Sequence, residues 1–289
     1  MGWVTIDYDK CTACGTCIDA CGRCFFMEGE RVAVNADESC CSVCGRCIAV
    51  CPTDAIAHSE MDMTNFPEIR KREFISTDDF TRFLRQRRSH RSFLDKTIPE
   101  SDIKKLVDIV RYCPTGSNSQ MVELLVIQNP DEIKKLSDLT VDFMIKSGSE
   151  AEKEVESLKA EVKAAPEEIG RMEMMALYGN MLKQSRETGN DPIFYNAPAV
   201  MVFHAKDMGF SMKDDCVIAS TTMGLLSRTM GLEFTYIGLF EGASNEDPAV
   251  MKALGLSKEN KVFSVIIVGY PGMKFLRMVD RKQTSVTYV

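Results

Sequence analysis

The sequence lacks several features that would assign it to a common class of protein. No apolar run reaches about 18 residues, the length that a membrane-spanning helix needs, and the mean hydropathy is −0.12. The only three histidines are His58, His90 and His204, which are scattered and form no metal-binding group by themselves. No G-x-G-x-x-G fingerprint for a dinucleotide is present. The missing apolar run argues against a membrane protein, whereas the missing fingerprint by itself says little about the use of a nicotinamide cofactor.

The chain also lacks a surplus of basic residues. Its 35 Lys and Arg and 42 Asp and Glu give a net charge of −7. Residues 1–60 hold nine acidic and four basic side chains, a balance of −5. Because nucleic-acid binding relies on neutralising phosphates with Lys and Arg, we expect no nucleic-acid partner. We expect a cytoplasmic protein that does not enter a membrane.

Cysteine is scarce after residue 51, where only Cys113 and Cys216 occur, and dense before it. Eight of the ten cysteines in the first 51 residues form two runs with the same spacing. The runs are Cys11, Cys14, Cys17 and Cys21, then Cys41, Cys44, Cys47 and Cys51. This spacing is similar to that of bacterial ferredoxins, which hold [4Fe-4S] clusters. Pro52 follows the second run as in ferredoxins, whereas Gly22 follows the first.

The resemblance to ferredoxins implies which cysteines share a cluster, because the fourth thiolate of each run ligates the other cluster. One set is then Cys11, Cys14, Cys17 and Cys51, and the other is Cys41, Cys44, Cys47 and Cys21. A zinc site is less well matched, since a third cysteine follows at the same short interval in both runs. A disulfide framework is disfavoured because the rest of the chain is poor in cysteine. Cys24 and Cys40 fit neither run, and their roles stay open.

The length allows a small cluster-binding module and one domain of about 200 residues. The cysteines end before a stretch of mixed charge that contains Pro67. We therefore predict a ferredoxin-like domain at residues 1–60, a linker at 61–76 and a second domain at 77–289. Ser76 begins a good N-cap cluster for the first helix of that second domain.

The second domain alternates between helical and strand patterns, which predicts an α+β fold with a mainly antiparallel or mixed sheet. Helices are expected at residues 80–88, 99–113, 131–146 and 214–230, and a solvated helical stretch broken at Pro166 is expected at 149–184. Strands are expected at residues 122–128, 199–204, 234–238 and 261–268. Methionine and aromatic residues recur between Met172 and Tyr195, where they could form core or cover a ligand.

Four motifs of the second domain resemble, in order, the FMN-dependent nitroreductase family. They are RRSHRSF at 87–93, CPTGSNSQ at 113–120, GLEFTYIG at 231–238 and VGYP at 268–271. The resemblance covers about residues 77–282. It implies a nitroreductase-like α/β/α flavin domain preceded by a small ferredoxin-like 2[4Fe-4S] domain. The chain departs from the family directly after Gln120, where Met121 and Val122 stand in place of the Pro-Trp of many members.

The same resemblance implies the residues that bind FMN. Arg87, Ser89 and Arg91 would hold its phosphate dianion, which needs fixed cationic donors. The full set is Arg87, Arg88, Ser89, Arg91, Pro114, Thr115, Gly116, Asn118, Tyr236, Ile237, Gly238 and Arg281. The loop from Pro114 would reach the flavin of a partner subunit, which implies a homodimer. No side chain is identified as a catalytic acid or base.

Together the two modules predict an FMN-dependent, nitroreductase-like oxidoreductase. We expect electrons to pass from a low-potential, ferredoxin-like donor through two [4Fe-4S] clusters to FMN, and on to an organic acceptor. The acceptor could be a nitroaromatic, a quinone or an activated alkene. Two alternatives stay open: a flavoenzyme that oxidises NAD(P)H and exports electrons through the clusters, and a redox sensor or electron carrier without enzymatic activity.

Overall fold

The computed structural model of the protein describes residues 3–69, 75–160, 166–209 and 211–289. The chain divides into two units: Met1–Ser76 with Ser117–Ser119, and Thr77–Gly116 with Gln120–Val289. The linker predicted at 61–76 falls in the first unit, and its residues 70–74 lie outside the described residues.

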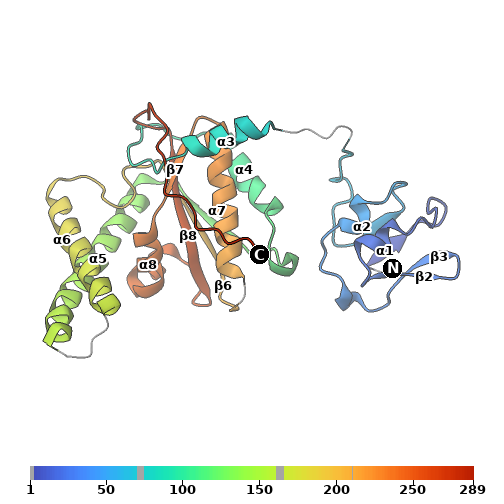
Figure 1. Ribbon diagram of the computed structural model, residues 1–289, viewed down its shortest axis with the longest axis horizontal. Coiled ribbons are helices and arrows are strands. Elements are labelled where there is room, and N and C mark those ends of the chain that lie inside the picture. The colour runs from blue at the N-terminus through green and yellow to red at the C-terminus, as the bar shows by residue number, and fades with distance from the viewer. Residues whose placement is uncertain (1–2, 70–74, 161–165, 210) are drawn as a thin grey trace. The chain divides into compact units, whose positions relative to one another are not determined.

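The first unit is built from two antiparallel strand pairs and short helices (Figure 1). Strand β1 (Val4–Ile6) pairs with β4 (Ile56–His58), and β2 (Phe25–Glu28) pairs with β3 (Arg31–Val34). Its helices are α1 (Thr16–Ala20), the 3₁₀ turn η1 (Glu38–Cys40) and α2 (Arg46–Ala49). Apolar strand residues and buried cysteines form its small core.

The two halves of this unit repeat with an offset of 30 residues, which is the offset between the two cysteine runs. Gly15 and Gly45 each precede a short helix with a left-handed backbone, at φ 78° and 68°. Ala13 and Val43 are also left-handed, at φ 56° and 50°. A β-branched residue such as Val43 rarely adopts this conformation, so the surrounding loop must impose it. Both cysteine runs are therefore bent in the same way.

The second unit is organised around a four-stranded antiparallel sheet in the order β5-β6-β8-β7. The strands are β5 (Glu123–Ile127), β6 (Ala199–Lys206), β7 (Glu233–Tyr236) and β8 (Asn260–Gly269). Strands β6 and β8 lie inside the sheet and are almost entirely buried. A strand covered on both faces needs apolar side chains at successive positions, and the sequence of β6, AVMVFHAK, has them.

Helices cover both faces of the sheet, as the α/β/α expectation requires (Figure 1). Helices α4 (Glu100–Asp108) and α7 (Met212–Thr229) pack on the face that carries Met201 and Phe203. The opposite face, with Val200 and Val202, is covered by α5 (Pro130–Ala160), α8 (Gly238–Glu246) and α9 (Pro248–Leu254). The alternation along β6 follows from the two-residue period of a strand.

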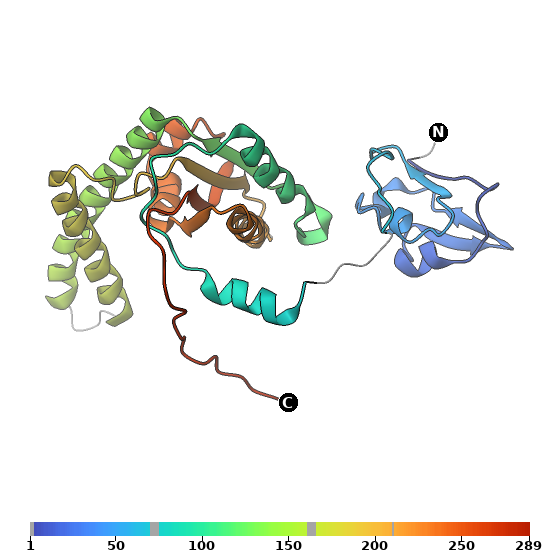
Figure 2. The same ribbon diagram turned by 90° about the horizontal axis from the view of Figure 1, so that it is seen from above.

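Helix α6 (Pro166–Glu187) pairs with α5 beside the sheet (Figure 2). The two helices touch where Gly148 of α5 meets Gly179 of α6. A Cβ atom on Gly179 would lie 2.9 Å from the Gly148 Cα. The absence of both side chains therefore allows this close crossing.

Several expected boundaries were wrong. We expected α5 to end near Lys146, but it continues through Gly148 to Ala160. Gly148 does not end the helix, because it lies at the crossing with α6. Strand β7 ends at Tyr236, and α8 begins at Gly238, inside the stretch expected to be extended. Helix α3 (Thr77–Gln86) ends shortly before the expected Arg88.

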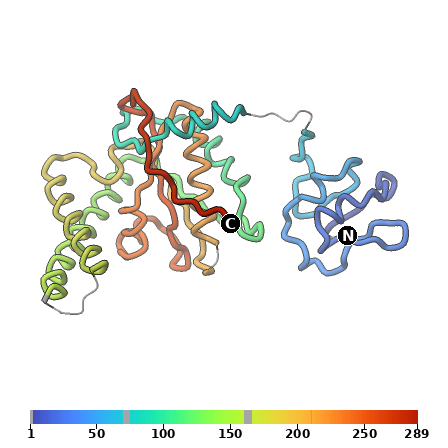
Figure 3. The backbone as a smooth tube through the Cα atoms, viewed as in Figure 1, coloured from blue at the N-terminus to red at the C-terminus, as the bar shows by residue number. Residues whose placement is uncertain are grey.

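After β8 the chain continues as an exposed extended tail over residues 271–289 (Figure 3). Contacts along its first half hold it to the rest of the unit: the Phe275 ring packs edge-on against His90 with centroids 4.8 Å apart, and the Val279 carbonyl accepts from Arg88 Nη2 at 3.4 Å. The Gly272 N–H donates to the Ser92 carbonyl at 2.8 Å, and the Leu94 N–H donates to the Tyr270 carbonyl at 2.9 Å. Among the helices that the structure describes, none combines the length and the apolar character needed to cross a membrane.

The glycine crossing predicts opposite effects for two substitutions in α6. We expect Gly179→Ala to lower the stability of the second unit by about 1–3 kcal/mol, because the new methyl group overpacks the contact with Gly148. Gly170→Ala is the matched control, since a Cβ there meets no atom within 4 Å. It should stabilise the helix by up to about 1 kcal/mol. Calorimetric melting of both variants tests this, and an equal effect of the two would contradict the crossing.

Candidate functional site

The cysteines of the first unit line two separate cavities. Cys11, Cys14, Cys17 and Cys51 line one of them, together with apolar side chains of β1, β3 and β4. Cys21, Cys41, Cys44 and Cys47 line the other. Each cavity thus receives three thiols from one run and the last thiol of the other run. These are the two sets that the ferredoxin spacing predicts.

The donors around the sulfurs suit thiolate ligands. The Val43 N–H donates to Cys41 Sγ at 3.2 Å, and the Ala55 N–H donates to Cys51 Sγ at 3.3 Å. Hydrogen bonds of this kind stabilise negative charge on cluster sulfurs. A tetrahedral zinc ion needs four ligands about 2.0–2.3 Å from one point. Within the described residues, no three His, Cys, Asp or Glu side chains form a group that could hold a single metal ion.

The protonation of the thiols differs with their surroundings. Burial raises the pKa of Cys47 to about 11 and also raises the pKa of Cys17. The side-chain hydrogen bond from Thr16 lowers the pKa of Cys14. The buried thiols therefore keep their protons at neutral pH unless a metal displaces them, which couples iron binding to proton release.

His58 contacts the second cavity from β4 and is 5% exposed. Its Nδ1 accepts a hydrogen bond from the Glu60 N–H at 3.0 Å. An accepting Nδ1 carries no proton, so in the neutral ring the proton is on Nε2. Nε2 lies 3.5 Å from Cys41 Sγ, and Trp3 packs edge-on against the ring. His58 therefore presents an N–H group to the Cys41 sulfur. The sequence reasoning treated this histidine as unconnected to a metal site.

In the second unit, residues 87–91 follow α3 as an extended segment held by its neighbours. The His90 N–H donates to the Phe234 carbonyl at 3.5 Å, and the adjoining residues pair with 270–272. The Arg87 and Ser89 side chains are half-buried, and Arg91 is exposed with its guanidinium 5.8 Å from the Tyr195 ring centre. Within the described part of the chain, the Arg87 guanidinium has no hydrogen-bond or ion-pair partner. That cation is available to an anionic ligand.

Arg88 has a different role from its neighbours. Its Nη1 donates to the carbonyls of Arg85 at 2.9 Å and Arg87 at 2.6 Å, which caps the end of α3. Its buried Nε has no hydrogen-bond partner among the described residues. Its Nη2 donates to the Val279 carbonyl at 3.4 Å. The guanidinium mainly supports the turn and the tail, and its buried Nε–H is left for a ligand.

A buried ionic group lies behind this segment. Arg228 of α7 donates from Nε to both carboxylate oxygens of Glu233, at 3.2 and 3.1 Å. Its Nη1 donates to the Phe83 carbonyl at 2.6 Å, which ties α3 to α7. His90 Nε2 lies 3.8 Å from Glu233 Oε2. Desolvation lowers the pKa of His90 against the opposing effect of Glu233, so the imidazole is neutral at pH 7.

The loop after Pro114 is anchored by a residue that the sequence reasoning missed. The Gly116 N–H donates to Asp215 Oδ1 at 3.0 Å, and Ser211 Oγ donates to Asp215 Oδ2 at 3.3 Å. A Cβ on Gly116 would collide with the Ser211 side chain. Asp215 is buried, but in the sequence it looks like an ordinary acidic residue in the first turn of a helix.

The left-handed backbone of this loop continues beyond Gly116. Ser117, Asn118 and Gln120 have φ values of 53°, 56° and 52°. Thr115 Oγ1 accepts the Gln120 N–H at 3.1 Å. Residues 117–119 group with the first unit, where the Asn118 side-chain amide donates to the Ser42 carbonyl at 2.8 Å. Such clustered strain is typical of functional loops.

The segment from Tyr236 to Gly238 links β7 to α8. The Ile237 N–H donates to the Val265 carbonyl at 3.0 Å, so it is not available to a ligand. Helix α8 begins at Gly238, and its first-turn N–H groups have no acceptor within the helix. The Tyr236 hydroxyl is 2.6 Å from Thr221 Oγ1 on α7. Any backbone donor to a ligand must therefore come from the start of α8, one residue later than Ile237.

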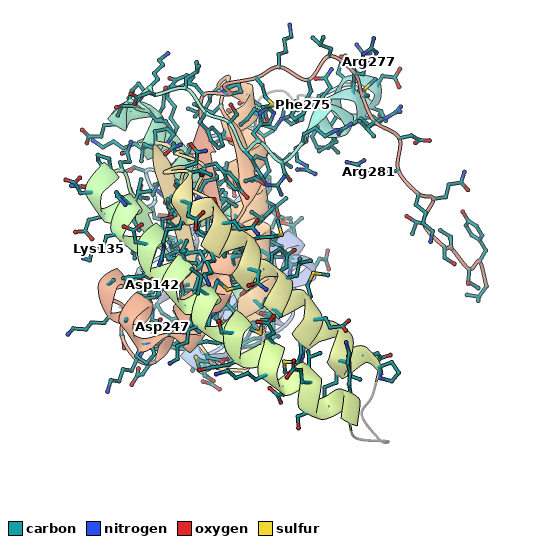
Figure 4. All side chains as sticks on the ribbon, turned by 90° about the vertical axis from the view of Figure 1, so that its left-hand side faces the viewer. Lys135, Asp142, Asp247, Phe275, Arg277 and Arg281 are labelled. Atoms are coloured by element: carbon teal, nitrogen blue, oxygen red, sulfur yellow. The ribbon has the colours of Figure 1, made fainter. Side chains whose placement is uncertain are left out.

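Arg281 lies on the exposed tail (Figure 4). Its backbone N–H donates to Asp280 Oδ1 at 2.9 Å, and its Nη1 donates to the Asp280 carbonyl at 3.3 Å. These contacts are local, and the structure does not connect Arg281 to the segment at 87–91. The structure brings together the Arg87–Arg91 segment, β7 and the start of the tail.

Comparison with known proteins gives a match for each unit. The model of the Nitroreductase family matches residues 84–270, and the model of the 4Fe-4S binding domain matches residues 4–23 and 34–57. A ferredoxin from Methanothermococcus thermolithotrophicus is 48% identical over 60 residues, which cover 20% of this chain and 98% of the ferredoxin.

The larger unit has more distant relatives. A protein of Archaeoglobus fulgidus with the provisional name NADH dehydrogenase/NAD(P)H nitroreductase is 21% identical over 194 residues, covering 67% of this chain and 86% of that protein. The crystal structure of a nitroreductase with bound FMN from Bacteroides fragilis superimposes with a TM-score of 0.55 at 18% identity. That match covers 74% of this chain and 100% of the other, and it confirms the expected fold.

Proposed function

Since the chain belongs to the nitroreductase family and carries a 4Fe-4S binding domain at residues 4–57, we propose that it is an iron-sulfur flavoprotein that reduces an organic acceptor. Its donor is a low-potential, ferredoxin-like protein, and its acceptor is a nitroaromatic, a quinone or an activated alkene. Residues 1–60 hold two [4Fe-4S] clusters, and residues 77–289 bind FMN. The observation that carries the proposal is that two complete four-cysteine sets precede a nitroreductase fold in one chain.

The two cofactors supply complementary chemistry, because clusters transfer single electrons and FMN transfers one or two. The residues that would hold the clusters are the two cavity sets, Cys11, Cys14, Cys17 and Cys51, and Cys21, Cys41, Cys44 and Cys47. Hydrogen bonds from Val43, Ala55 and His58 direct positive N–H dipoles at their sulfurs. The protein thus provides thiolates and N–H donors on a strained, pre-bent backbone.

FMN binding is supported by the bound FMN of the Bacteroides fragilis structure and by the available donors of this chain. Arg87 and Arg91, with the Ser89 hydroxyl between them, would hold the phosphate, and Arg88 Nε would add one N–H group. The loop Pro114–Gly116, placed by Asp215, would approach the ring. The first turn of α8 at Gly238 would direct backbone N–H groups toward it. We retain Asn118, Tyr236, Ile237 and Arg281 as candidate contacts.

We also propose that the active form is a homodimer. Helix α6 carries an exposed apolar stripe at helical spacing, Met174, Leu177, Tyr178 and Met181, which are 51%, 53%, 39% and 54% exposed. A stripe of this kind on a long helix is typical of a surface that another chain covers. A second copy of the chain is the partner that the family fold favours.

The cellular location that we propose is the cytoplasm. Free thiols and clusters of this type fit a reducing compartment such as the cytoplasm.

The phosphate site predicts a loss of FMN affinity in two variants. We expect Arg87→Ala and Arg91→Ala each to weaken FMN binding by about 10–100-fold, because each removes a charge-assisted hydrogen bond worth about 1.5–3 kcal/mol. Arg82→Ala is the control, since Arg82 is exposed on α3 and pairs with Asp79. Fluorescence titration of the FMN-depleted protein with FMN measures the affinities. Unchanged affinity in both variants would remove these arginines from the site.

The His58 contact predicts a change in the reduction potential of one cluster. We expect His58→Phe to shift that midpoint potential to more negative values, because the N–H group at Cys41 Sγ stabilises the extra negative charge of the reduced cluster. His58→Gln is the matched control, since its amide keeps an N–H donor and should retain most of the wild-type potential. Potentiometric titration followed by electron paramagnetic resonance measures both. Equal potentials for the two variants would mean that the hydrogen bond has no such effect.

The proposed electron donor is tested by anaerobic stopped-flow absorbance of the holoprotein. We expect a chemically reduced 2[4Fe-4S] ferredoxin to bleach the flavin and cluster bands at least about tenfold faster than NADH or NADPH at equal concentration. Rapid bleaching by NADH alone would overturn the donor, and would favour the reaction in the name of the Archaeoglobus fulgidus relative. A holoprotein that reduces no acceptor after full reduction would overturn the enzymatic role.

A further inference from the structure

Two cysteines of the first unit belong to neither of the four-cysteine sets, and the structure brings them together. Cys40 Sγ and Cys24 Sγ are 2.9 Å apart. A disulfide bond has an S–S distance of about 2.05 Å, so a shift of about 1 Å would join them. Both thiols also line the cavity that holds Cys21 and Cys41.

The internal repeat separates this pair from the ligands. With the 30-residue offset, Cys24 corresponds to Asp54 and Cys40 corresponds to Lys10. The other half of the unit therefore places no cysteine at either position and still forms a complete four-cysteine set. A cluster in the second cavity has its four ligands without them. Cys24 and Cys40 are therefore not needed as cluster ligands.

The backbone holds both thiols in place, but they differ in access to solvent. Cys24 is 2% exposed, and its carbonyl accepts the Asn35 N–H at 2.8 Å. Cys40 ends the turn η1, whose N-cap Asp37 accepts the Ser39 N–H, and it is half-buried. Cys40 is therefore the thiol that an external reagent reaches, and Cys24 is placed to react only with its neighbours.

We propose that Cys24 and Cys40 form a redox-active thiol pair that closes to a disulfide by exchange with a small-molecule disulfide. The inference rests on the ligand sets of the proposed function, which leave both thiols free. Cys40 attacks the external disulfide, forming a mixed disulfide and releasing one small thiolate that takes up the Cys40 proton. Cys24 then attacks the Cys40 sulfur, and the second small thiolate leaves and takes up the Cys24 proton. The protein loses two electrons and two protons, and the external disulfide gains both.

Closure would connect the start of the β2–β3 hairpin to the turn before the second cysteine run. The cross-link would span the 15 residues between the two cysteines. It would restrict the unfolded chain and restrain the backbone next to Cys21 and Cys41, two residues of the same cavity. Exposed clusters are vulnerable under oxidising conditions. The same conditions would close the disulfide and so stabilise the backbone that lines the cavity. Reducing conditions would reopen the pair.

The test uses the full-length holoprotein, kept free of oxygen and incubated with either glutathione disulfide or reduced glutathione. Denaturation in N-ethylmaleimide and digestion with trypsin, which cleaves after Arg23, Arg31 and Arg46, place Cys24 in peptide 24–31 and Cys40 in peptide 32–46. We expect a linked pair of these peptides in most chains of the oxidised sample and its absence from the reduced sample. Fragment spectra should place the link on Cys40, not on Cys41 or Cys44. Iron per chain should be equal in both samples.

The Cys40→Ser variant should lose the linked peptide and keep the wild-type iron content. Alkylation of both Cys24 and Cys40 in the oxidised wild type, with iron intact, would overturn the pair. A loss of iron in Cys40→Ser would also overturn it, because Cys40 would then be a ligand. Little iron in every sample would count against the proposed ligand sets, and the peptides would still show whether these two thiols join.

Discussion

The exchange of one cysteine between two equivalent runs is the constraint on which the first unit depends. Cys21 reaches the cavity of the second run, and Cys51 reaches the cavity of the first. Neither four-cysteine set is complete unless both halves have folded together. The small apolar core and the short strand pairs would give little stability alone at this size. Metal binding and folding of this unit are therefore closely coupled.

In the second unit, the candidate ligand site lies on extended segments and loops, which need contacts with the rest of the unit to hold one conformation. Buried polar contacts hold these segments to the sheet and its helices. Arg228 and Glu233 fix the segment after α3, and Asp215 fixes the loop at Gly116. The buried sheet centred on β6 gives these anchors a rigid base. Cationic and N–H groups are thus preorganised before any ligand arrives, which reduces the ordering that binding requires.

Much of this arrangement could be predicted from the sequence. The spacing identified the eight cysteines, and the resemblance to ferredoxins implied their crossed grouping. Periodicity located the central strands of the second unit within one or two residues. The start of α8 at Gly238 was missed because the whole stretch from Phe234 to Gly238 has the pattern of a strand. The continuation of α5 was missed because a glycine in a helix pattern suggests an end, and only the partner glycine in α6 explains it. Asp215, His58 and the Cys24–Cys40 contact depend on residues far apart in the chain, so no local pattern could reveal them.

The central claim is that one chain carries two four-cysteine cluster sites and a flavin site. It is tested most directly by the iron, acid-labile sulfide and FMN content of protein purified without oxygen. The account predicts about eight irons, about eight sulfides and about one FMN per chain. Zinc in place of iron, about four irons per chain, or the absence of flavin would contradict it.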